Sequence, residues 1–230
     1  MRKSLTAFGL LIALNVKCHL CNQRNAAFAF IEFLVLVVSV AVLLLLFASA
    51  TPRNKGTSLR VKCTGNLKQV ALGYLLWAQD NQQGLPMESP TSAGGIREQA
   101  LAGDLLSSVR IAADQFRTPS ILICPGDKKR KPAETFANLT TASISYFLNV
   151  DAAFANQNQI LTGDRSLAIA GSRVKSGLLQ ITNPWDVQWT NWLHGDGNVA
   201  LIDGSAHQVT SRGLRDLLTL GGPTSRLIIP

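Results

Sequence analysis

The sequence lacks the short motifs by which many hydrolases and nucleotide-binding enzymes are found. It has no G-x-S-x-G, H-E-x-x-H, P-loop or G-x-G-x-x-G pattern, and it contains only 3 histidines in 230 residues. Few side chains are therefore suited to acid–base chemistry at neutral pH. With 47% hydrophobic and 16% charged residues, the composition is also far from that of a disordered chain. We expect a folded protein that is not an enzyme.

Charged side chains are almost missing from one long stretch. Residues 28–50 contain a single charge, Glu32, in an otherwise apolar sequence. At about 1.5 Å per residue a helix of this length spans roughly 35 Å, which exceeds the ~30 Å hydrocarbon core of a bilayer. The pattern predicts a transmembrane helix over 28–50, a linker and an amphipathic helix over 51–82, and a globular region over 83–230.

Acidic residues are absent before this stretch, where the charged side chains are all basic: Arg2, Lys3, Lys17 and Arg24. Basic residues also follow the stretch, but a carboxy-terminal domain of this length can be translocated largely regardless of flanking charge. We therefore predict a single pass, with residues 1–27 in the cytoplasm and residues 83–230 outside it. The basic run 128–131 has no interleaved aromatic residues, so no specific nucleic-acid partner is predicted.

Cysteine is scarce, and the 4 cysteines fall on two sides of the predicted membrane helix. Cys18 and Cys21 would lie on the reducing side, where a single C-x-x-C pair is a weak indication of a metal site. Cys63 and Cys124 would face an oxidising compartment, where a disulfide can persist. They could pair there, or remain as two buried free thiols.

The region after the membrane segment has the periodicity of a helix. Its apolar residues recur at i, i+3, i+4, i+7, i+8 and i+11, namely Leu67, Val70, Ala71, Tyr74, Leu75 and Ala78. This spacing predicts an amphipathic helix from Leu59 to Asp80, preceded by a kink or break near Pro52 and Gly56. The next region is less regular, and we predict a helix over 96–116 and a short strand over 120–124.

The last third of the chain has the features of β-structure. Residues 143–150 and 159–163 are candidate strands, and residues 198–202 and 205–209 flank an Asp-Gly pair that is typical of a hairpin turn. A short amphipathic helix is predicted over 214–220. The fold class that follows is α+β.

Two clusters near this hairpin are candidate sites. Asp196, Asn198 and Asp203 offer oxygen ligands for a calcium ion, and the alternative is a tight connection before the hairpin. Asp203, Ser205 and His207 are the residue types of a catalytic triad. Alternate residues of one strand are about 6.6 Å apart, however, whereas triad members lie within ~3 Å of each other. We therefore expect no triad, and no cofactor apart from the calcium candidate.

Several segments together resemble type IV prepilins and type II secretion pseudopilins. Residues 25–37, N-A-A-F-A-F-I-E-F-L-V-L-V, are similar to the prepilin processing junction, in which a polar basic leader precedes a long apolar helix with a glutamate near its start. Further landmarks of this group are matched by R-V-K-C-T-G-N-L-K-Q-V-A-L-G-Y-L-L-W-A-Q-D-N at 60–81, I-C-P-G-D at 123–127, I-L-T-G-D-R at 160–165 and H-G-D-G-N-V-A-L-I-D-G-S at 194–205.

The resemblance implies a processing site and an assembly residue. Prepilin peptidase would cut between Ala27, which stands where glycine is usual, and Phe28, whose new amino group would be methylated. Glu32 would lie one helical turn from that ammonium group and pair with it, within one subunit or between neighbours. Residues 1–27 would then be a leader peptide.

The fold implied by the resemblance is α+β. A long N-terminal hydrophobic helix would continue after a kink into the amphipathic helix, which packs on a C-terminal antiparallel sheet. The implied function is that of a structural subunit in the bacterial inner membrane, with other pilin or pseudopilin subunits as partners in a pilus or pseudopilus. The alternative is a signal-anchored extracytoplasmic binding domain that does not polymerise.

Overall fold

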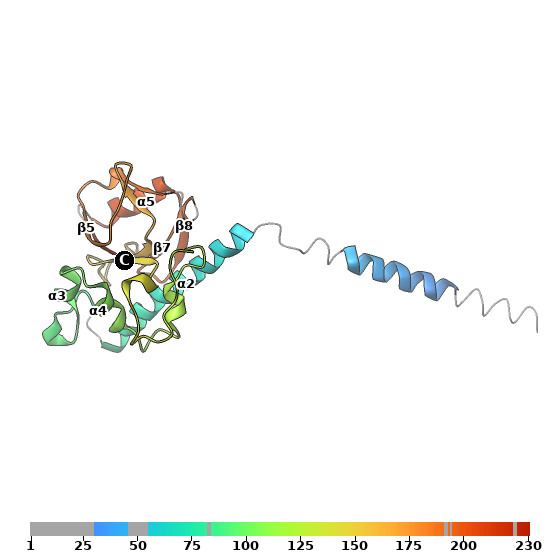
Figure 1. The fold of residues 1–230 in the computed structure, drawn as a ribbon, viewed down its shortest axis with the longest axis horizontal. Coiled ribbons are helices and arrows are strands. Elements are labelled where there is room, and N and C mark those ends of the chain that lie inside the picture. The colour runs from blue at the N-terminus through green and yellow to red at the C-terminus, as the bar shows by residue number, and fades with distance from the viewer. Residues whose placement is uncertain (1–29, 46–54, 82–83, 191–192, 194, 223–224) are drawn as a thin grey trace, which may run out of the picture. The chain divides into compact units, whose positions relative to one another are not determined.

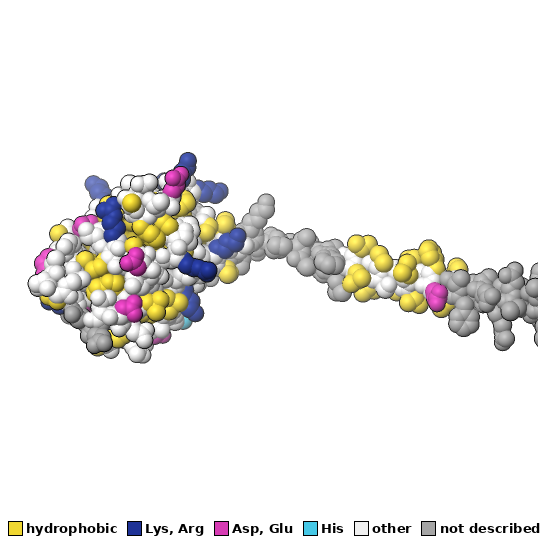
Figure 2. Space-filling view, turned by 90° about the horizontal axis from the view of Figure 1, so that it is seen from below, with side chains coloured by type: hydrophobic (Ala, Val, Ile, Leu, Met, Phe, Trp, Pro, Cys, Tyr) yellow, Lys and Arg dark blue, Asp and Glu magenta, His cyan; other side chains and the backbone are white. Residues whose placement is uncertain are grey.

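The computed structural model describes residues 30–45, 55–81, 84–190, 193, 195–222 and 225–230. The chain divides into two compact units, 1–53 and 54–230, and each is considered by itself. In the first unit, residues 30–45 form an apolar helix (Figure 1). Hydrophobic side chains cover the part of this helix that is visible in Figure 2.

The predicted long N-terminal hydrophobic helix is wrong. The structure describes residues 30–45 of the predicted span as helix, and residues 28–29 and 46–50 lie outside the described residues. Among the residues that the structure describes, none of the helices is long and apolar enough to cross a membrane.

The second unit begins with the helix α2 (Lys55–Asn81). The predicted apolar face is the buried face, since Leu67, Val70, Ala71, Tyr74 and Ala78 are all at most 3% exposed. Gly56 lies inside the helix, so the predicted break is not at this position; Pro52 lies outside the described residues.

The region between α2 and the sheet consists of short helices: η1 (Thr91–Ala93), α3 (Arg97–Leu101), α4 (Leu105–Arg110), η2 (Pro119–Leu122) and η3 (Thr141–Ser143). The predicted helix over 96–116 is interrupted, because Gly103 has a left-handed φ of 81° and the Asp104 side chain caps α4. The predicted strand over 120–124 is largely a 3-10 helix, in which Pro119 occupies the first turn and Thr118 accepts from the Ser120 N–H.

A six-stranded antiparallel sheet has the order β5-β9-β1-β2-β7-β8. Its strands are β1 (Tyr146–Asn149), β2 (Ile160–Asp164), β5 (Gly177–Ile181), β7 (Gly197–Leu201), β8 (Ala206–Val209) and β9 (Ser225–Ile229). The predicted strands are present as β1 and β2, and the predicted hairpin as β7 and β8. In the turn of that hairpin Gly204 has a φ of 80°, a conformation that favours glycine.

A second sheet has the order β4-β3-β6, with β3 (Leu167–Ile169), β4 (Ser172–Arg173) and β6 (Val187–Trp189); η4 (Pro184–Asp186) precedes β6. The helix α5 (Ser211–Leu220) follows the hairpin. Two hydrophobic clusters result: one between α2, the short helices and the large sheet, and one between the large sheet, α5 and the small sheet. Both form from residues of the second unit alone.

Candidate functional site

The apolar helix of the first unit carries the predicted assembly residue. Its large side chains are all strongly exposed, from 46% at Val40 to 71% at Leu45. Glu32 is its only charged residue, and it lies on the described part of the helix and is exposed. The predicted processing residues Ala27 and Phe28 lie outside the described residues.

In the second unit Cys63 of α2 and Cys124, just after η2, are joined by a disulfide with an S–S distance of 2.09 Å. Both residues are fully buried. Two hydrogen bonds hold the same region: Asn66 Nδ2 donates to the Ile123 carbonyl (2.9 Å), and the Tyr146 hydroxyl donates to the Cys63 carbonyl (3.3 Å). The segment around Cys124 is therefore fastened to α2 by both covalent and polar contacts.

Asp127 lies at the centre of a buried polar cluster next to the disulfide. Its carboxylate accepts two hydrogen bonds from the Arg165 guanidinium (2.8 and 3.2 Å) and one from the Ser145 hydroxyl (3.1 Å). Arg130 Nε lies 3.8 Å from the same carboxylate. Burial, and then the charge of Arg165, lower the pKa of Arg130 to about 10. Removal of Asp127 would leave these cations partly buried without their counter-charge.

Asp164, the last residue of β2, carries a second buried carboxylate. One of its oxygens accepts from both the backbone N–H and the Nδ2 of Asn198, each at 2.8 Å. The Asn198 Oδ1 in turn accepts from the Thr64 hydroxyl of α2 (2.9 Å). Burial raises the pKa of Asp164 to about 7, and the charge of Asp127 also raises it. These bonds join β2, β7 and α2 at one point.

The polar network connects three segments that lie far apart in the sequence. Asp127 belongs to the segment 123–127, Asp164 and Arg165 to 160–165, and Asn198 to 194–205. Asp127, Asp164 and Asn198 are at most 2% exposed. A substrate could not reach these carboxylates without opening the core, so the network joins elements. Sequence reasoning gave no role to Asp127 or Asp164; the only signal was that each follows a glycine at the end of an apolar segment.

The structure does not bring the predicted calcium ligands together. Asn198 lies near the start of β7, and its side chain is engaged by Asp164 and Thr64. Asp203 lies in the turn beyond the other end of this strand, about 16 Å away at ~3.3 Å per residue, and Asp196 precedes the strand. In the described part of the chain no group of three or more His, Cys, Asp or Glu side chains could hold a metal ion.

The Ser205 hydroxyl lies within hydrogen-bond distance of both Asp203 and His207, contrary to the expectation from strand geometry. The Ser205 hydroxyl donates to Asp203 Oδ1 (2.6 Å), and His207 Nε2 lies 2.7 Å from the same hydroxyl oxygen. The spacing of about 6.6 Å holds for backbone positions along one strand, whereas Asp203 and Ser205 precede β8 and the side chains of Ser205 and His207 approach each other. This is still not a triad, since the hydroxyl proton is directed to Asp203 and His207 must act as the donor. The Ser205 hydroxyl also lowers the pKa of Asp203.

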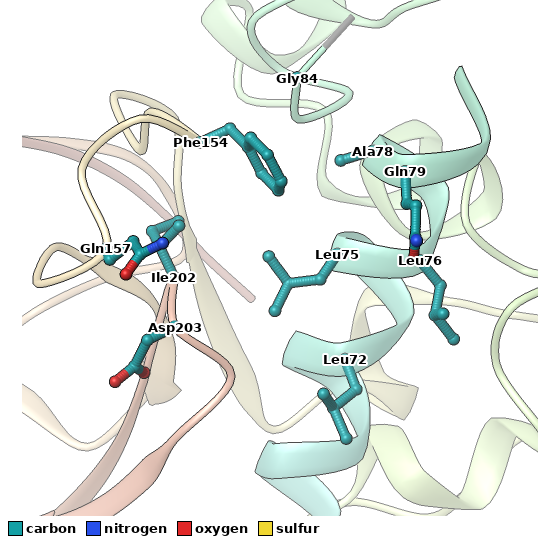
Figure 3. A pocket seen from close by; sticks show the side chains of 10 residues that line it. All are labelled: Leu72, Leu75, Leu76, Ala78, Gln79, Gly84, Phe154, Gln157, Ile202 and Asp203. Atoms are coloured by element: carbon teal, nitrogen blue, oxygen red, sulfur yellow. The ribbon is translucent and has the colours of Figure 1, made fainter. Parts of the chain in front are cut away.

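A hollow of about 630 Å³ lies between α2, the loop after β1 and the hairpin turn (Figure 3). Its wall is mainly apolar, with Leu72, Leu75 and Leu76 from α2 and Ile202 from the hairpin. The Phe154 ring points into it in Figure 3, and the Phe154 N–H donates to Glu88 Oε2 at 2.9 Å. This hydrogen bond fixes the loop that carries Phe154, so the ring that lines the hollow has a defined position.

Comparisons with protein-family models, with curated proteins and with solved structures each find no match for this chain.

Proposed function

We propose that the protein is a non-enzymatic structural subunit of a bacterial pilus or secretion pseudopilus. Prepilin peptidase removes residues 1–27, and Phe28 becomes the methylated amino terminus. The subunit is held at the inner membrane before assembly, with the globular region from about Leu59 onward outside the cytoplasm. Residues 30–45 then pack among the same segments of other subunits.

The exposed apolar helix 30–45 is the observation that carries this proposal. A helix that is hydrophobic on all sides must be surrounded on all sides, by lipid or by other helices. Contact with one globular partner would cover only one side. A bundle of identical helices satisfies the requirement, and a repeating assembly supplies such a bundle.

Glu32 gives the apolar helix a property that a simple anchor does not require. A carboxylate in a low-dielectric bundle is costly when it has no counter-charge. Cleavage before Phe28 creates an ammonium group about one turn from Glu32 in the sequence. Pairing of these charges, within a subunit or between neighbours, would favour the assembled state.

The disulfide between Cys63 and Cys124 supports the proposed location. Structural disulfides persist in oxidising compartments and are rare in the cytoplasm. The globular region that contains it would therefore lie outside the cytoplasm, on the side where a filament is exposed.

Substitution of Glu32 tests the proposal. We expect Glu32→Ala and Glu32→Gln to lower the amount of the protein in sheared surface fractions about tenfold, with the membrane pool unchanged. Ser39→Ala is the matched control, because Ser39 lies on the same helix and its hydroxyl is already bonded to the Leu36 carbonyl (2.8 Å). Equal recovery of assembled material from the wild type and both Glu32 variants would contradict the proposal.

Amino-terminal sequencing of the membrane-extracted protein is the second test. We expect the mature chain to start at Phe28. A chain that keeps residues 1–27 would instead indicate the signal-anchored binding domain that does not polymerise.

A further inference from the structure

The edge strand β8 presents hydrogen-bonding groups that the sheet does not use. The Leu201 N–H donates to the Ser205 carbonyl (2.9 Å), which makes these two residues a hydrogen-bonded pair. Because such pairs alternate along an antiparallel ladder, His207 and Val209 also bond to β7. The backbone groups of Ala206 and Gln208 therefore face away from the sheet. Within the described residues, no hydrogen bond reaches them.

The helix α2 runs beside this strand edge and forms a groove with it. A cleft of about 340 Å³ is lined by Val61, Gly65 and Lys68 of α2 and by Ala206 and Gln208 of β8. Farther along α2 lies the 630 Å³ hollow beneath Phe154. The exposed residues of α2 that line the two spaces recur at helical spacing: Val61, Gly65, Lys68, Leu72 and Leu76. The two spaces are separate cavities along the same side of α2, and we call them together the α2–β8 groove.

The two ends of the α2–β8 groove differ in chemistry. At the cleft, Lys68 presents an exposed ammonium group, and Arg60 is held by the Gln208 amide oxygen at 2.6 and 2.7 Å. At the hollow, Leu72, Leu76 and the Phe154 ring form an apolar wall. The centres of the two spaces are separated by roughly eleven residues of helix, or about 16 Å. An extended chain covers this distance in four to five residues.

We propose that the α2–β8 groove binds an extended segment of a partner protein, which pairs with β8 as an additional strand. The outward backbone groups of Ala206 and Gln208 supply the main-chain hydrogen bonds. An acidic side chain of the segment reaches Lys68, and an apolar or aromatic side chain about four residues away enters the hollow beneath Phe154. This binding does not depend on polymerisation through residues 30–45.

A synthetic probe tests the proposal with the full chain held in lipid nanodiscs. The probe is a fluorescein-labelled ten-residue peptide of alternating valine and threonine, with one aspartate and one phenylalanine four positions apart. We expect it to bind in fluorescence anisotropy titrations. A version methylated on alternate backbone nitrogens, which cannot pair as a strand, should bind about tenfold more weakly. Equal binding of both versions, or no binding of the unmethylated probe at millimolar concentration, would overturn the proposal.

Variants locate the binding in the groove. A side chain at Gly65 would enter open space, since a Cβ there meets nothing within 4 Å, and Gly56 on the same helix is equally open but outside the groove. Gly65→Phe should weaken binding of the probe about tenfold, and Gly56→Phe should leave it unchanged. Gln208→Pro, which removes an outward N–H without breaking a bond to β7, should also weaken it. Equal effects of Gly65→Phe and Gly56→Phe on binding would contradict the proposal that the probe binds in the α2–β8 groove.

Charge reversal tests the role of Lys68. Lys68→Glu should weaken binding of the aspartate probe and strengthen binding of a probe with lysine in place of aspartate. Unchanged preference between these probes would overturn the proposal that an acidic side chain of the partner segment reaches Lys68.

Sedimentation velocity of the chain without peptide is the last measurement. Self-association that is lost in Gly65→Phe would assign the groove to a second copy and overturn the proposal of a separate partner.

Discussion

The helix 30–45 and α2 differ in how much of their apolar surface is covered within their own units. In α2 one apolar face is covered by the chain itself, with Leu67 at 0% exposure, while Leu72 and Leu76 stay exposed on its other side. In the helix 30–45 the apolar residues lie on all sides, and Leu36 is 59% exposed. The comparison teaches that the second unit completes its own core, whereas the first unit leaves the apolar surface of the helix 30–45 exposed.

Loss of the disulfide should have the largest effect on the second unit. The bond between Cys63 and Cys124 closes a loop across a sequence separation of 61 residues, which corresponds to about 4 kcal/mol in chain-entropy terms. We expect the double variant Cys63→Ala, Cys124→Ala to lose this amount in urea unfolding followed by tryptophan fluorescence. Reductant should lower the midpoint of the wild type and leave the variant unchanged. Equal midpoints for both proteins without reductant would argue against the bond.

The same substitution in both helices sharpens the comparison directly. Leu67→Ala removes a fully buried side chain and should lower the free energy of unfolding of the second unit by about 3 kcal/mol. Leu36→Ala should change it by less than about 0.5 kcal/mol, because Leu36 is exposed and lies in the other unit. Denaturant titrations of the two variants in parallel measure this difference. A comparable loss in both would mean that the helix 30–45 belongs to the same cooperative structure.

Asp164 should make the second unit less stable as the pH rises. Burial raises its pKa to about 7, against about 4 in an unfolded chain, so the folded state favours the protonated form. The stability that this group contributes is therefore complete below about pH 4 and is lost as the pH rises to about 7. Asp164→Asn keeps an oxygen for the Asn198 donors and should be more stable than the wild type by on the order of 2 kcal/mol at pH 8. The gap should narrow as the pH falls from about 7 and close near pH 4; a gap that does not change with pH would contradict the assignment.

The smallest expected effect is a gain at the exposed side of α2. Gly65→Ala should stabilise the second unit by about 1 kcal/mol, because the site is open and alanine is the better helix former. Gly73→Ala on the same helix is the contrasting variant, since its Cβ would collide with the Phe116 ring. Thermal unfolding of the two variants should show shifts of opposite sign. Equal shifts would mean that α2 is not packed as described.

Local signals in the sequence predicted the parts of the fold that depend on neighbouring residues. The apolar spacing from Leu67 to Ala78 identified the buried face of α2, and the Asp203-Gly204 pair located the hairpin turn. A helix over 96–116 was predicted from the same kind of signal and was wrong, because Gly103 interrupts it with a left-handed φ.

Contacts between distant segments could not be predicted in the same way. β9 carries no hairpin signal, since it pairs with β1 and β5 far earlier in the chain. The polar network also depends on such contacts: Asp127 meets Arg165, and Asn198 meets both Asp164 and Thr64. Composition shows that these residues are polar, but only the fold shows that they are buried together.

The place of β9 in the sheet sets the order in which the protein can be built during synthesis. β9 follows every other element in the sequence, yet it is the strand that connects β5 to β1. The ribosome must therefore pass Ile229 before β5 can join the sheet, and until then β5 and one edge of β1 lack their strand partner. Cys63 and Cys124 emerge much earlier, so an oxidase can cross-link α2 to the following segment before the sheet closes.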